Sequence, residues 1–87
     1  MNLPFQQKEH SENTFIRKFE EKTSSDEFKW HKDNEDRIVT PMHKTNWMFQ
    51  RENKLPEPIV NEIKIKAGEW HRIIKGTGDL ELKIIKN

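Results

Sequence analysis

Short stretches in which apolar and polar residues alternate constrain the fold of this chain most strongly. The clearest lies near the C-terminal end, where Leu80, Leu82 and Ile84 alternate with Glu81 and Lys83. Alternation of this kind is the period of a β-strand with one buried face. The strand-like stretches cover residues 13–20, 27–31, 37–42, 47–51, 63–66, 70–75 and 80–84. Turn-forming residues separate them, which predicts an all-β fold, a small β-barrel or sandwich of about six to eight short antiparallel strands.

The N-terminal part of the chain carries a weaker pattern. Residues 1–12 have no periodicity and few apolar groups, so we expect an N-terminal arm that is flexible or docks elsewhere. A single β domain over residues 13–87 follows this arm. Phe15 and Phe19 also fit helical spacing, so a helix over residues 12–22 is the alternative to a first strand.

Charge and composition exclude several classes of protein. The 16 basic and 15 acidic residues are interspersed and give a formal net charge of +1, which argues against nucleic-acid binding. The chain has no cysteine, which rules out disulfides, thiolate zinc sites and a cysteine nucleophile. No apolar run is long enough to span a bilayer, so we expect no membrane partner and a cytoplasmic location. Because 87 residues build only a modest core, we expect a homodimer that covers one sheet face.

The dipeptide Trp-His occurs twice, as Trp30-His31 and as Trp70-His71. His31 and Asp33 are two residues apart, so on a strand their side chains project from the same face. If His71 lies on a neighbouring strand, the three side chains form a triad of two histidines and one carboxylate. Such a triad is typical of Fe(II) sites and would also hold Mn(II), Ni(II) or Zn(II). The repeated dipeptide therefore indicates a divalent-metal site.

The same alternation gives a conflicting expectation for these histidines. It places Phe28 and Trp30 on the buried face, so His31 and Asp33 would face the solvent. On that interpretation His31 and His71 are partly exposed strand histidines, and the acidic residues nearby form a solvated turn with local salt bridges. A β-bulge near Asp33, or dimerisation over the tryptophan face, would reconcile the alternation with a metal site.

Two longer runs carry a resemblance to a known family. Residues 30–37 read Trp-His-Lys-Asp-Asn-Glu-Asp-Arg, and residues 67–80 read Ala-Gly-Glu-Trp-His-Arg-Ile-Ile-Lys-Gly-Thr-Gly-Asp-Leu. Together they resemble the two conserved blocks of small single-domain cupins, a β-barrel family. The order and spacing are also similar to those of short cupin-like proteins of bacteriophages and marine metagenomes. The resemblance implies a barrel whose inward side chains bind a metal.

The resemblance also assigns roles to individual residues. In cupins three histidines and a glutamate bind the metal. His31 matches the first of these histidines, and His71 matches the last, at the end of a Gly-x-x-His turn. Asp33 replaces the second histidine, and Glu35 or Asp36 stands near the position of the glutamate. The metal ligands implied by the resemblance are therefore His31, Asp33, Glu35 and His71.

Two functions from different classes follow. The first is a cupin-like protein with a divalent-metal or small polar ligand site in the barrel, where Gln50 or Arg72 contacts the ligand. Its role as an enzyme stays open, with the metal acting as a Lewis acid or binding dioxygen. Trp47 is expected in the core or an interface, and a sugar- or base-stacking wall is its alternative role. The second function is that of a non-catalytic, phage-encoded interaction protein that binds a host or viral macromolecule.

Overall fold

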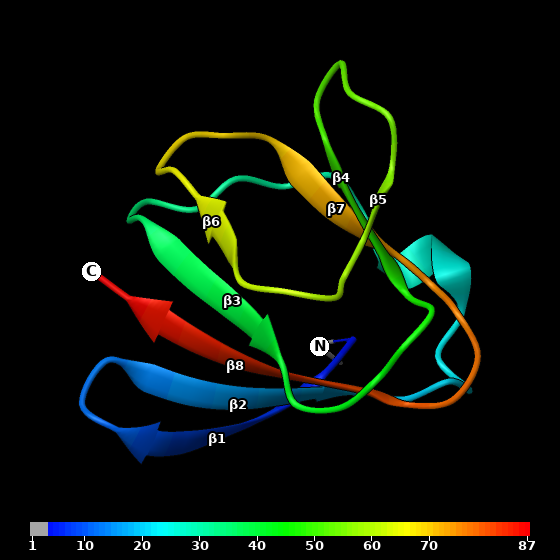
Figure 1. Ribbon diagram of the computed structural model, residues 1–87, viewed down its shortest axis with the longest axis horizontal. Helices are drawn as coiled ribbons and strands as arrows, with labels where there is room; N and C mark the ends of the chain where they lie inside the picture. The colour runs from blue at the N-terminus through cyan, green and yellow to red at the C-terminus, as the bar shows by residue number, and fades with distance from the viewer. Residues whose placement is uncertain (1–3) are drawn as a thin grey trace.

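A computed structural model describes residues 4–87, and almost all of its regular structure is β-strand (Figure 1). The strands are β1 (Gln6–Ser11), β2 (Thr14–Phe19), β3 (Arg37–Pro41), β4 (Met48–Arg51), β5 (Glu57–Pro58), β6 (Ile63–Ile65), β7 (His71–Ile74) and β8 (Leu80–Lys86). A single turn of 3-10 helix, η1 (Ser25–Glu27), precedes β3. The prediction of an all-β fold with about six to eight short antiparallel strands is confirmed.

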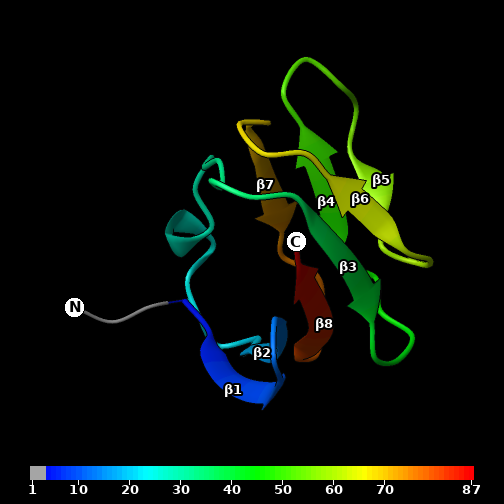
Figure 2. The ribbon, with the colours of Figure 1, turned by 90° about the vertical axis from the view of Figure 1, so that its left-hand side faces the viewer.

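The strands form two sheets that face each other. One has five strands in the order β1-β2-β8-β3-β6, and the other has three in the order β5-β4-β7. Every strand pair in both sheets is antiparallel. In Figures 1 and 2, β4 and β7 lie across from β2 and β8. The two inner faces therefore enclose the interior of a small sandwich.

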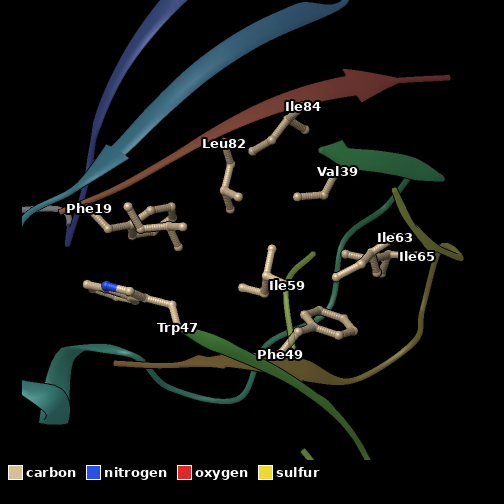
Figure 3. Packing of buried hydrophobic residues seen from close by; sticks show 10 residues of the cluster. Phe19, Val39, Trp47, Phe49, Ile59, Ile63, Ile65, Leu82 and Ile84 are labelled. Atoms are coloured by element: carbon tan, nitrogen blue, oxygen red, sulfur yellow. The ribbon is translucent and has the colours of Figure 1, made fainter. Parts of the chain in front are cut away.

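The core lies between the two sheets and follows the alternation seen in the sequence. In β8, Leu80, Leu82 and Ile84 are all buried, while the residues between them are half-buried. Figure 3 shows Leu82, Ile84 and Val39 pointing from the five-stranded sheet toward Trp47 and Phe49 of the opposite side. The buried apolar residues are Phe19, Val39, Trp47, Phe49, Ile59, Ile63, Ile65, Leu80, Leu82 and Ile84.

The N-terminal segment adds a strand to the edge of the larger sheet. Strand β1 pairs with β2, so the alternative helix over residues 12–22 does not form. Asn13, in the tight turn between the two strands, has a φ of 63°, a conformation that asparagine tolerates better than most residues. The expected arm thus docks on the domain as a strand from residue 6 onward. Residues 1–3 of that arm lie outside the described residues.

The segment 27–31, predicted as a strand, is the main departure from the sequence pattern. Ser24 caps the short helix η1 by accepting a hydrogen bond from the backbone N–H of Asp26. The chain then leaves the helix at Phe28 with φ −95° and ψ 78°, and only at His31 does it meet another strand. Phe28 packs against the core as expected, but Trp30 is 40% exposed. The predicted burial of Trp30 is wrong because this irregular segment breaks the two-residue period.

Candidate metal centre

The two copies of Trp-His lie side by side and are joined backbone to backbone. The His31 N–H donates to the His71 carbonyl at 3.0 Å, and the His71 N–H donates to the His31 carbonyl at 2.9 Å. This is a hydrogen-bonded antiparallel pair, so the two histidines project from the same face. Their ring centroids are 4.3 Å apart.

The antiparallel register of this bridge also explains the residues on either side of the histidines. Each copy reads Trp-His followed by a basic residue, so the tryptophan of one copy lies opposite the basic residue of the other. The Arg72 guanidinium lies 4.8 Å from the centre of the Trp30 ring, and the Lys32 ammonium lies 5.4 Å from that of Trp70. Both tryptophans are 40% exposed. The two histidines therefore lie on the inner side of this strand pair and the two tryptophans on its outer side.

Asp33 completes a cluster with the two histidines. One possible ligand atom from each of His31, Asp33 and His71 lies within 4.8 Å of the others. Asp33 Oδ2 lies 3.4 Å from His71 Nε2 and is buried without a hydrogen-bond partner among residues 4–87. The other oxygen, Oδ1, lies 3.5 Å from Arg37 Nη1, which holds the carboxylate from behind.

Backbone carbonyls fix which ring nitrogen of each histidine faces the cluster. His31 Nδ1 lies 3.0 Å from the Lys29 carbonyl oxygen, and His71 Nδ1 lies 2.8 Å from that of Glu69. A carbonyl can only accept a hydrogen bond, so Nδ1 is the donor in both rings. The Nε2 of the neutral ring is left with a free lone pair, which is how metal-binding histidines are usually oriented.

The electrostatics of the buried ring favour its neutral form. Burial lowers the pKa of His71, and the nearby His31 ring lowers it further. The hydrogen bond to the Glu69 carbonyl and the charge of Asp33 act in the opposite direction. A neutral His71 presents a lone pair to the buried Asp33 oxygen, for which the described residues supply no hydrogen donor. Two facing acceptors of this kind are stabilised by a cation between them.

A tight turn brings the two sequence blocks into register. The backbone N–H of Gly68 donates to the Asp33 carbonyl at 2.9 Å, and the N–H of Ala67 donates to Asp36 Oδ1 at 2.8 Å. Gly68 has a φ of 80°, which glycine adopts at little cost. Asp36 is thus a tether between the blocks rather than a neighbour of the histidines.

Glu35 is not part of the cluster. Its Oε1 lies 3.2 Å from Arg37 Nη2 and 3.6 Å from Lys86 Nζ, so two cations already compete for this carboxylate. The structure therefore brings together three of the four residues expected as metal ligands and directs Glu35 into an ion-pair network.

The residues expected to contact a ligand lie elsewhere. The Arg72 Nε donates to Gln50 Oε1 at 2.9 Å, and Arg72 stacks on the outward-facing Trp30. Trp47 is fully buried, and its Nε1 donates to the Gly78 carbonyl at 2.8 Å, as a core residue would. The structure thus places Gln50 and Arg72 with the outer face and Trp47 in the core, because β4 and β7 turn alternate residues to opposite sides.

The cluster opens into a cavity between the sheets with a volume of about 380 Å³. Most of its wall is apolar, with side chains from both sheets and from the segment around Phe28. His31, Asp33 and His71 line one part of it, and Arg17 and Arg37 add two cations. His31 is exposed while His71 is 4% exposed, so the cluster lies where the cavity reaches the surface. Neither arginine was expected here from the sequence, although Arg17 shares the core-facing side of its strand with Phe19.

The architecture is that of a small cupin-like β-sandwich, and solved structures of cupin proteins share it. A cupin-2 domain containing protein from Shewanella frigidimarina superposes with a TM-score of 0.65 at 15% identity, over 98% of this chain and 82% of that chain. A cupin domain from Bordetella pertussis gives 0.62 at 13% identity, over 100% and 98%.

A larger metalloprotein has the same fold over part of its length. The crystal structure of Fe(II) HppE matches with a TM-score of 0.62 at 14% identity, over 85% of this chain. The match covers 41% of the HppE chain, so this protein spans less than half of it. No protein-family model matches the sequence, and no curated protein matches it significantly. Within residues 4–87, no helix is long and apolar enough to cross a membrane.

Proposed function

We propose that this protein binds one divalent transition-metal ion through His31, Asp33 and His71 and presents it to a small ligand in the cavity. The observation that carries the proposal is the buried Asp33 oxygen, which faces the His71 ring at 3.4 Å and has no hydrogen-bond partner in the part of the chain that the structure describes. A bound cation would satisfy this oxygen and the free lone pairs of both rings at once. HppE, described as an Fe(II) protein, has the same fold, which supports the proposal by analogy.

The donor set narrows the choice of ion. Two imidazoles and one carboxylate suit Fe(II), Mn(II), Ni(II) and Zn(II), while Mg(II) and Ca(II) prefer all-oxygen ligands. Three protein ligands leave coordination positions open, through which a bound ion would act as a Lewis acid toward a small ligand. In this arrangement the Lys29 and Glu69 carbonyls orient the rings, and Arg37 orients Asp33.

Metal binding is tested on purified protein. After incubation with each ion and removal of the excess, elemental analysis should find close to one ion per chain. At a metal concentration a hundred times its Kd, binding should stabilise the fold by about 2.7 kcal/mol, seen as a rise in Tm. His31→Ala and Asp33→Asn should abolish both effects.

Two further variants serve as controls. His43 is exposed and its Nδ1 contacts the adjacent Lys44 carbonyl, so His43→Ala removes an imidazole without touching the cluster. Glu35→Gln removes the carboxylate that the structure directs away from the cluster. Both should bind metal like the unmodified protein. A protein that takes up no ion, or that keeps its ion in His31→Ala, would refute the proposal.

A further inference from the structure

A second polar feature of the cavity lies on the opposite sheet. Strand β2 places Arg17 between Phe15 and Phe19 on the side that faces the interior, directly across from Leu82 of β8. Phe19 is 4% and Leu82 is 3% exposed, so the guanidinium stands in a row of core residues. Arg17 also lines the cavity that holds the histidine cluster.

The charge of Arg17 has no acidic partner within residues 4–87. Its Nε donates to Gln7, and its guanidinium lies 4.2 Å from the centre of the Phe5 ring. Burial, reinforced by the nearby Arg37, lowers the pKa of Arg17 to about 10, and the charge of Asp33 only partly opposes this. Retaining a cation here costs stability, as burying a charge without a counter-ion does.

The other cavity arginine shows the contrast. Arg37 lies between Asp33 and Glu35, at 3.5 Å and 3.2 Å from their carboxylates, so its charge is balanced. Within residues 4–87 Arg17 makes no such ion pair, and its guanidinium, a planar fork of N–H donors, lines a cavity whose wall is mostly apolar. This is the arrangement that recognises a carboxylate in two-point fashion.

From these contacts we infer that the cavity binds a small organic carboxylate, with the Arg17 guanidinium holding the carboxylate and the apolar wall enclosing the rest. The volume of about 380 Å³ lies at the lower end of the range of roughly 300–1,000 Å³ that is typical of small-molecule pockets. Phe5, Phe28 and Ile73 supply aromatic and aliphatic contacts. The site shares its cavity with the proposed metal centre, but binding of the carboxylate to Arg17 does not require the ion.

Phenylacetate and its uncharged isostere phenylacetamide test this inference on the full chain. The titrations are done in EDTA, so their result does not depend on the metal centre, and binding is followed by NMR chemical-shift perturbation and by the rise in Tm. Phenylacetate should bind and perturb the methyl resonances of Leu82 and Ile73. Phenylacetamide should bind at least ten times more weakly. This comparison uses the unmodified protein and needs no variant to fold.

A matched pair of variants assigns the binding to the guanidinium. Arg17→Met removes the charge and keeps the length of the side chain, while Arg72→Met makes the same change on the outer face beside Trp30. Arg72→Met should bind phenylacetate normally, and Arg17→Met should lose at least ten-fold in affinity while keeping its fold. Arg17→Lys should fall between them because it keeps the charge without the fork. Absence of phenylacetate binding, equal binding of the amide, or unchanged affinity in Arg17→Met would overturn the inference.

Discussion

Because the interior holds a cavity, we expect a larger side chain at Val39 to raise the stability of the fold. Val39 is 7% exposed and lines the cavity from β3. In a fully packed core, an added methylene costs about 1–3 kcal/mol through strain. Here the δ-methyl group of Val39→Ile has space to enter, and isoleucine keeps the β-branching that suits a strand. Burying one methylene group contributes about 0.8 kcal/mol. For a domain of this size that corresponds to a rise in Tm of about 3–6 °C.

Urea and thermal unfolding of metal-free protein measure this effect. Val60 provides the matched control because it is 62% exposed, so Val60→Ile adds the same methylene in solvent and should change stability by less than about 0.5 kcal/mol. Val39→Ile should also weaken phenylacetate binding, since the added group takes space from the ligand. A lower Tm for Val39→Ile than for the unmodified protein would show that the side chains of the two sheets leave no such space.

Two other predictions concern the turns and loops between the strands. At Gly76 an added Cβ would overlap Asn46 Oδ1 and lie 2.9 Å from the Asn46 carbonyl carbon. At Gly78 an added Cβ would meet no atom of residues 4–87 within 4 Å, and the φ of 74° is what opposes the substitution. We therefore expect Gly78→Ala to lower the free energy of unfolding in urea by about 1–2 kcal/mol, and Gly76→Ala to lower it clearly more. Equal losses in the two variants would contradict this expectation. Asp36→Ala removes the acceptor of the Ala67 N–H, which should lower the stability of the fold by about 1 kcal/mol and weaken metal binding. An unchanged metal affinity would show that this hydrogen bond does not position the cluster.

The sequence was most informative where burial follows a local period. Leu80, Leu82 and Ile84 could be assigned to a buried strand face because each alternates with a charged residue in one regular strand. The side to which the His31 side chain points could not be predicted from such alternation. Its orientation is set by one turn of 3-10 helix and an irregular link, and neither has a period that the sequence displays. His31 moreover pairs with His71 from a distant part of the chain. The sequence around His31 does not specify the register of that pairing.

The roles of the polar residues in and around the cavity could not be predicted from residue type alone. Glu35 stands near the position of the cupin glutamate in the sequence, but its carboxylate forms ion pairs with Arg37 and Lys86 instead. Arg17 is recognisable in the sequence as a charged residue on the core-facing side of a predicted strand. Its role as a lining residue depends on the cavity, which forms only when the two sheets pack together. The homodimer stays a prediction; the outward tryptophans, Trp30 and Trp70, lie on the face that it would have to cover.

The reciprocal bridge between His31 and His71 has a consequence for how the protein opens. The stretch from residue 28 to residue 36 pairs with β7 at this one bridge, and its far end is held by the hydrogen bonds from Gly68 and Ala67, whereas β7 and β4 share a longer ladder. Segments with few backbone hydrogen bonds are the ones that detach first in local unfolding. Detachment of the stretch 28–36 would separate His31 from His71. A metal ion bound by both histidines would therefore favour the closed state of this stretch. Amide exchange at these two histidines would then report metal occupancy directly, slowing as the ion holds the segment closed.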